Sequence, residues 1–178
     1  YFTDIMERHN IRNIEEFNEI LDFLSSSVGS LTNSSKLVKT FKSVKNKTIS
    51  DLTITKYMDY MQDAFLINKV SRYDIKGKKY IGSPVKYYFE DIGLRNARIN
   101  FRQTEENHIM ENIIYNELRY RGYRVDVGVV EVYGRDTQSK KTTKTTYEVD
   151  FVASKGNQKF YIQSAFAIPN PEKKAQEE

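Results

Sequence analysis

The segment TYEVDFVASKGNQKFYIQSA, at residues 146–165, predicts two β-strands joined by a Gly-Asn turn. The first strand carries Glu148 and Asp150, whose side chains share one face because side chains alternate along a strand. Gln163 follows Asp150 after 13 residues and lies in the second strand. Carboxylate and amide oxygens are the ligands that a hard divalent cation such as Mg²⁺ prefers. The spacing therefore raises the question of a metal-dependent nuclease site.

A nuclease of this kind would place a lysine two residues after its last metal ligand, where this chain has Ala165. Ala165 offers neither a proton nor a positive charge to a reacting phosphate. Three interpretations stay open: a degenerate site that does not cleave, an active nuclease with a displaced lysine, and an ordinary hairpin. The candidates for a displaced lysine are Lys159, on the strand face of Gln163, and Lys173 or Lys174 further along the chain.

The residues before this segment complete an α+β unit. TEENHIMENIIYNELRYRG, at 104–122, predicts a long helix that is capped by Thr104 and ends at Gly122. DIGLRNARIN, at 91–100, predicts a short connecting helix. Strands are predicted at 123–133, 147–153 and 159–168, with the polar segment 134–146 as a loose hairpin tip. We expect a helix packed on an antiparallel sheet.

The N-terminal part predicts three helices and then strands. Asn13 and Glu16 form a capping box, and apolar residues follow with a period of 3.6. A second helix is expected at 34–44, and a third opens near Thr53. The period then changes to 2, which predicts a hairpin around a Lys76-Gly77 turn and a third strand at 85–91. This order is typical of a winged helix-turn-helix.

The net charge of +4 is unevenly distributed. Residues 36–86 hold twelve Lys or Arg and four Asp, a net charge of +8, which leaves −4 for the rest of the chain. Such a segment suits a phosphate-backbone binder, although a lysine-rich solvated surface explains the charge equally well. The residues predicted to contact nucleic acid lie on the third helix and the hairpin tip: Thr53, Thr55, Lys56, Lys76, Lys78 and Lys79.

Other features exclude several classes of protein. The chain has no cysteine, and His9 and His108 are almost a hundred residues apart, so disulfides and a zinc site are not expected. No run of about 18 apolar residues is present, and the first residues do not have the pattern of a signal peptide. We therefore expect a cytoplasmic protein with no membrane partner. Because the first residue is not Met, we expect a piece of a longer protein.

Three stretches together resemble a known family: YYFEDIGLRNARINFRQTEENHIMENIIYNELRYRGYRVDVG at 87–128, EVDFVA at 148–153 and YIQSA at 161–165. They resemble the C-terminal region of prokaryotic AAA-type ATPases, whose tail domain is classed as of unknown function and resembles the PD-(D/E)xK nuclease fold. ISDLTITKYMDYMQDAFLINKVSRYDIKGKK, at 49–79, resembles the winged helix before that tail. No phosphate-binding Gly-x-x-x-x-Gly-Lys-Ser/Thr loop is present in the sequence. We therefore expect ATP to bind only to a missing ATPase module.

The resemblance also implies a set of site residues. In the PD-(D/E)xK arrangement, a helix glutamate and two strand residues hold Mg²⁺, and a lysine positions or activates the attacking water. By this pattern the helix acid is Glu111, with Glu117 as second choice, and the strand ligands are Asp150 and Gln163. Lys159 is the further catalytic candidate.

Together these observations predict two domains: a helical and winged-helix domain at 1–90, and a restriction-endonuclease-like domain at 91–178 that is truncated at its C-terminus. We expect the non-ATPase C-terminal part of a AAA-type ATP-binding protein, which binds double-stranded DNA or a partner and does not catalyse a reaction itself. The alternatives are a Mg²⁺-dependent DNA nuclease with a displaced lysine and a protein–protein interaction module.

Overall fold

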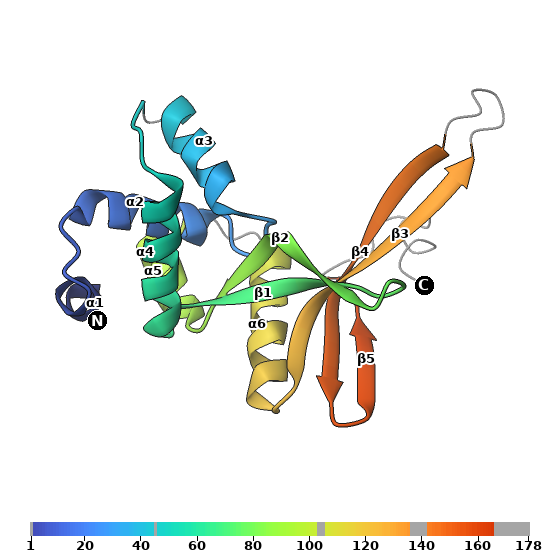
Figure 1. The fold of residues 1–178 in the computed structure, drawn as a ribbon. Helices are drawn as coiled ribbons and strands as arrows, with labels where there is room; N and C mark the ends of the chain where they lie inside the picture. Colours follow the sequence, from blue (N-terminus) through green and yellow to red (C-terminus); the bar gives the residue numbers. More distant parts are fainter. Residues whose placement is uncertain (1, 45, 103–105, 136–141, 166–178) are drawn as a thin grey trace.

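The structure is a computed structural model that describes residues 2–44, 46–102, 106–135 and 142–165 of the chain. Within these residues it is an α+β protein with six helices and a five-stranded mixed sheet (Figure 1). Figure 1 shows the first helices on one side, the sheet on the other, and a long hairpin that runs from one to the other. None of the helices in the described part is long and apolar enough to cross a membrane.

Four helices form the N-terminal part: α1 (Phe2–Arg8), α2 (Ile14–Ser26), α3 (Ser34–Val44) and α4 (Asp51–Asp63). The capping box at the start of α2 is confirmed in part, because the Asn13 side chain accepts a hydrogen bond from Glu16 N at 3.2 Å. Helix α3 has the predicted bounds. Helix α4 starts two residues before the predicted Thr53, because Ser50 is its cap and accepts a hydrogen bond from Thr53 N at 3.0 Å.

The hairpin consists of β1 (Ile67–Asp74) and β2 (Lys79–Phe89). The separate strand predicted at 85–91 is instead the end of β2, which pairs with β1 on both sides of an irregularity between Val70 and Arg72. The predicted turn at Lys76 and Gly77 is confirmed. An isolated bridge joins Thr32, between α2 and α3, to Val85 on β2.

The second part contains α5 (Ile92–Arg98), α6 (Glu106–Tyr120), β3 (Arg124–Arg135), β4 (Thr142–Lys155) and β5 (Gln158–Ile162). Strand β4 begins within the segment predicted as a hairpin tip. Its β-branched threonines suit a strand, and they pair with the end of β3. Strand β5 ends earlier than predicted; the end of that prediction, like the predicted cap Thr104, lies outside the described residues.

The sheet joins the two parts of the chain. Its strand order is β2-β1-β3-β4-β5, and all neighbours are antiparallel except β1 and β3. The parallel pairing brings Arg72 to Asp74 opposite Val127 to Val129. One hydrophobic cluster also contains residues of both parts, from Phe17 in α2 to Phe151 in β4. The domain boundary predicted after residue 90 therefore falls between elements that share a sheet and a core.

Gly128 lies at this junction between β1 and β3. A Cβ atom built there would be 2.9 Å from Ile75 Cδ1, Val149 Cβ and Val152 Cγ2. The Ile75 side chain can move, but Val149 Cβ is held by the backbone of β4. A side chain at residue 128 would therefore push the hairpin away from the sheet.

We predict that Gly128→Ala lowers the free energy of unfolding by about 1–3 kcal/mol because it overpacks the junction. Gly82→Ala is the control, since a Cβ at that position would have no atom within 4 Å other than those of its two neighbours in the chain. It should change stability by no more than about 0.5 kcal/mol. Urea denaturation of the two variants measures the difference, and equal stabilities would show that the junction tolerates a side chain.

Candidate functional site

A buried lysine lies where β2, α6 and β4 meet. Lys86, on β2, is only 4% exposed. Its Nζ is 3.1 Å from Glu111 Oε2 on α6 and 2.8 Å from Glu148 Oε1 on β4. Burial alone would lower the pKa of Lys86, but the charges of both glutamates and the hydrogen bonds to them raise it above its ordinary value. Lys86 is therefore charged at neutral pH and forms an ion pair with each glutamate.

Tyr88 adds a second donor to Glu111. Its hydroxyl donates to Glu111 Oε2 at 3.0 Å, and its ring stacks on that of Tyr115 with centroids 4.8 Å apart. Burial raises the pKa of Tyr88 strongly, and the charge of Glu111 raises it further. The hydroxyl therefore stays protonated and remains a donor. His108 Nδ1 lies 3.9 Å from the other oxygen of Glu111.

Asp150 occupies a β-bulge on β4. Asp126 pairs with Val152 and Gly128 with Val149, so Asp150 and Phe151 are both opposite the single residue between Asp126 and Gly128. Asp150 is 6% exposed. Bulges of this kind redirect side chains and are frequent beside active sites.

The oxygen atoms of Asp150 and Gln163 have local partners. Asp150 Oδ2 accepts hydrogen bonds from Ser164 N at 2.8 Å and from Ser164 Oγ at 2.7 Å. The backbone N–H of Asp150 donates to Gln163 Oε1 at 3.3 Å. Gln163 thus lies close to Asp150. Its side-chain oxygen, however, already accepts a hydrogen bond from the backbone of β4.

The structure separates the other predicted site residues. Of the two glutamates considered on the helix, Glu111 is buried against Lys86, whereas Glu117 faces solvent and pairs with Arg121 at 2.7 Å. Lys159 does not join the cluster; its Nζ lies 5.0 Å from the centre of the Tyr73 ring. Lys173 and Lys174 lie outside the described residues.

The donor atoms of this cluster suit Mg²⁺ in type, because they are carboxylate oxygens. Their arrangement does not accommodate the ion as it stands, since Lys86 Nζ takes the position between Glu111 and Glu148. Among the residues that the structure describes, no group of three His, Cys, Asp or Glu side chains is placed to hold a metal ion. The magnesium site of Glu111, Asp150 and Gln163 stays a prediction, and it requires Lys86 to move.

Lys86 was not among the residues singled out from the sequence. It is 25 residues from Glu111 in the chain, and no motif spacing links the two. One signal was present: Lys86 interrupts the apolar run Val85, Tyr87, Tyr88, Phe89, and all five residues are buried. A lysine inside such a run is rarely buried without a partner, so it indicates a buried acid elsewhere.

The residues predicted to contact nucleic acid fall into two groups. Thr55 and Lys56 are exposed on α4. Thr55 helps to line a groove of about 170 Å³ between α4 and the hairpin, together with Asp59 and Lys69. Thr53 is half-buried, and its hydroxyl lies 2.8 Å from that of Ser50. The three exposed tip lysines, Lys76, Lys78 and Lys79, lie at the far end of the hairpin from α4, where it joins β3 (Figure 1).

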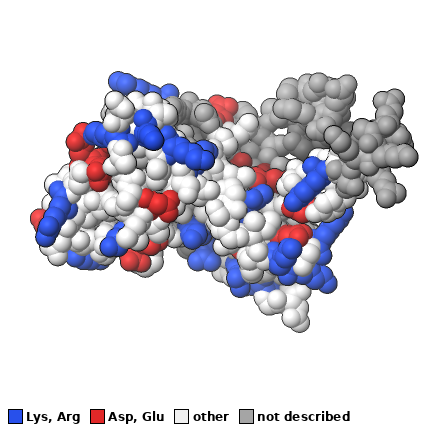
Figure 2. Space-filling model, turned by 45° about the horizontal axis from the view of Figure 1, so that its top comes forward, with Lys and Arg blue, Asp and Glu red and all other residues white. Residues whose placement is uncertain are grey.

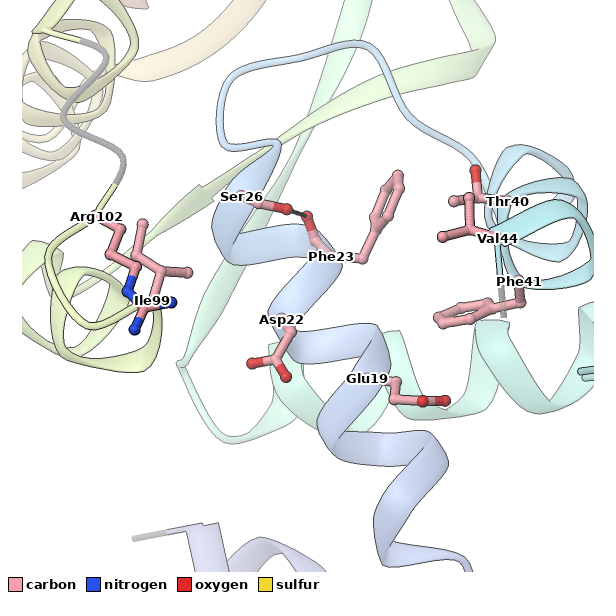
Figure 3. Close-up of a pocket in the computed structure, with 9 residues that line it drawn as sticks. All are labelled: Glu19, Asp22, Phe23, Ser26, Thr40, Phe41, Val44, Ile99 and Arg102. Carbon is pink, nitrogen blue, oxygen red and sulfur yellow. Dashed lines mark hydrogen bonds between the residues drawn. The ribbon is translucent and has the colours of Figure 1, made fainter. Parts of the chain in front are cut away.

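A separate cavity of about 350 Å³ lies between α2, α3 and the segment after α5 (Figure 3). Phe23, Phe41 and Ile99 form much of its apolar wall. Its two carboxylates are already paired, Glu19 with Lys47 and Asp22 with Arg98. The cavity is therefore a hydrophobic recess, and its acids are not arranged for chemistry.

Comparison with known proteins shows one family and two relatives. Residues 1–105 match a family described as "Domain of unknown function (DUF8612)". The chain is 36% identical over 167 residues to an uncharacterized protein of Haemophilus influenzae, and 29% identical over 168 residues to one of Methanocaldococcus jannaschii. Each alignment covers 94% of this chain but only 38% and 34% of the respective relative. No solved structure matches the chain.

We predict that Lys86→Met lowers the free energy of unfolding by about 3–5 kcal/mol at pH 7, because it leaves two carboxylates without their buried cation. Since folding raises the pKa of Lys86, its stabilising contribution is complete below the unfolded pKa of about 10.4. That contribution is lost as the pH rises through the higher pKa of the folded state. Urea denaturation of wild type and variant at several pH values measures this.

The matched control is Lys69→Met, at an exposed lysine on β1. Its effect should stay within about 0.5 kcal/mol at every pH. If the Lys86 variant behaved like this control, the ion pairs would contribute nothing to stability.

Proposed function

The chain belongs to the DUF8612 family, and we propose that it is the non-ATPase part of a longer AAA-type ATP-binding protein and binds double-stranded DNA through a winged helix. The chain spans 38% and 34% of the length of the two relatives described above, which supports its being one part of a larger protein. In this proposal ATP is bound by a separate module, and the second half of the chain is a nuclease-like domain that does not cleave.

The order of the N-terminal elements supports the winged helix. Helix α2 is followed by the Thr32 bridge, then by α3, α4 and the β1–β2 hairpin. Thr32 N donates to Val85 O at 2.8 Å, and Val85 N donates to Thr32 O at 3.0 Å. A helix, a short strand, two helices and a hairpin whose second strand pairs with that short strand is the winged helix-turn-helix order. By this comparison α4 is the recognition helix.

The exposed basic side chains around α4 are the observation that carries the proposal. Lys56 on α4 and Lys69 on β1 are exposed, as are Lys36, Lys39 and Lys42 on α3. Figure 2 shows Lys and Arg along the upper edge of the helical part, on the left as in Figure 1, with Asp and Glu among them and further Lys and Arg over the sheet on the right. Flexible lysines contact phosphates readily and read bases poorly, so we propose backbone binding with little sequence preference.

The second half supports a nuclease-like fold without cleavage. Helix α6 packs against β2, β3 and β4 of the sheet, and the bulge at Asp150 is of the kind found beside active sites. Lys86 neutralises Glu111 and Glu148 where a nuclease would hold its cation. A second candidate function is a Mg²⁺-dependent DNA nuclease with a displaced lysine. The same Lys86 favours it, because this lysine comes from another strand and contacts two acids.

We predict that a 20-base-pair duplex binds with an affinity that falls steeply with salt and differs little between unrelated sequences. Replacing Lys56 and Lys69 with alanine should reduce the slope of log K against log salt by about 0.9 for each phosphate that the protein no longer neutralises. Replacing Lys76, Lys78 and Lys79 together should flatten the slope further only if the same duplex reaches the hairpin tip. Fluorescence anisotropy at several salt concentrations measures these slopes.

The control is Arg119→Ala, which removes an exposed cation on α6 outside the basic segment. It should leave the slope unchanged. Absence of binding at low salt, or binding that salt does not weaken, would instead favour a protein–protein interaction module.

We predict that supercoiled plasmid incubated with the purified chain and Mg²⁺ or Mn²⁺ is nicked no faster than with the variant Glu111→Gln/Asp150→Asn. This variant keeps the side-chain shapes and removes two of the predicted ligands, so it measures contamination. Nicking by the wild type that the variant lacks would establish the nuclease and refute the non-cleaving proposal.

A further inference from the structure

We propose that Lys86 is a built-in substitute for a divalent cation, and that it competes with such an ion for the carboxylates of Glu111 and Glu148. The proposal rests on the geometry of the cluster alone and does not depend on DNA binding. Lys86 Nζ is within 3.1 Å of one oxygen from each glutamate, and these come from a helix and a strand that only the fold brings together.

Burial explains why a cation must be present. The side chains of Lys86 and Glu111 are 5% and 12% exposed. Removing an ion from water costs several kcal/mol unless an opposite charge and hydrogen bonds compensate. The buried carboxylate of Glu111 therefore requires a positive charge beside it, whereas Glu148, whose side chain is 32% exposed, remains partly in contact with solvent. A lysine supplies that charge from within the chain, whereas a metal ion must be taken from solution.

The remaining contacts show that lysine and metal cannot both be held. Glu111 Oε2 accepts hydrogen bonds from Lys86 and Tyr88, and Glu148 Oε1 accepts one from Lys86. On the side of the α2–α3 connection the cluster is closed by Gly29, where a Cβ would lie 3.2 Å from Glu111 Oε2. Glu148, whose side chain is 32% exposed, marks the open side. An ion that enters there meets Lys86 Nζ between the two acids.

Replacing Lys86 by a metal ion would change how the two halves of the chain are connected. Lys86 belongs to the hairpin of the first half, whereas both glutamates belong to the second half. The positive charge that compensates the two glutamates of the second half is thus supplied by the first half. A metal ion would satisfy the same acids without that tie.

The proposal is tested with Mn²⁺ and no DNA. Wild type should show no change in melting temperature with MnCl₂, because Lys86 holds the carboxylates. Lys86→Met should be stabilised, with a rise of roughly 5–10 °C at an ion concentration of about 100 times the Kd. Titration calorimetry should give at least a tenfold lower Kd for Mn²⁺ in Lys86→Met than in wild type. Adding Glu148→Gln to this variant should remove the gain.

Two matched variants serve as controls. Lys86→Arg keeps a cation and should behave like wild type, and Lys69→Met removes an exposed lysine and should also show no gain. If Lys86→Met does not fold by itself, MnCl₂ should restore its cooperative unfolding transition, because the ion replaces the missing positive charge between Glu111 and Glu148. The proposal is overturned if Lys86→Met gains no Mn²⁺ binding, or if it shows no cooperative transition when Mn²⁺ is present.

Discussion

The contact of Lys86 with Glu111 and Glu148 is the constraint on which the rest of this structure depends. Lys86 and Glu111 are buried, and buried charges are tolerated only when they are paired; Glu148 completes the contact from the more exposed side. The three side chains together hold a strand, a helix and a second strand in place relative to one another. Asn112 strengthens the contact between α6 and β2. Its side chain accepts from Phe89 N at 2.8 Å and donates to Phe89 O at 2.7 Å, and α6 thereby completes the backbone hydrogen bonding at the end of β2.

The contact between α6 and β2 also determines the course of the hairpin. Its base is held against α6, and its far end pairs in parallel with β3, so the tip cannot move freely as a wing would. The proposed DNA-binding surface is accordingly centred on α3, α4 and the base of the hairpin, while the tip lysines belong to the sheet side. A sheet and a hydrophobic cluster that both halves share couple the two halves in the described part of the chain, as the proposed transmission of binding to a separate ATPase module would require.

Much of the local structure was predictable from the sequence because its causes are local. The apolar periods of 3.6 and 2 distinguished helices from strands, and a polar cap marked the start of α2. The preference for Glu111 over Glu117 agrees with their burial, because Glu117 pairs with Arg121 one turn away in solvent. The prediction of a separate strand at 85–91 was wrong, because β2 continues through its irregular pairing with β1.

The sequence by itself determined the type of most elements, although not α1 or the first residues of β4, together with the acids Glu148 and Asp150 on one strand face and the uneven distribution of charge. Only the tertiary structure decided which cation those acids receive. Motif spacing pointed to position 165, which holds Ala165, and strand alternation made Lys159 a candidate. The lysine that contacts Glu111 and Glu148 is instead Lys86, from a strand on the other side of the predicted domain boundary. The reason is physical: a buried ion pair depends on distance in space and on low exposure, and both arise here from the way the hairpin passes over α6.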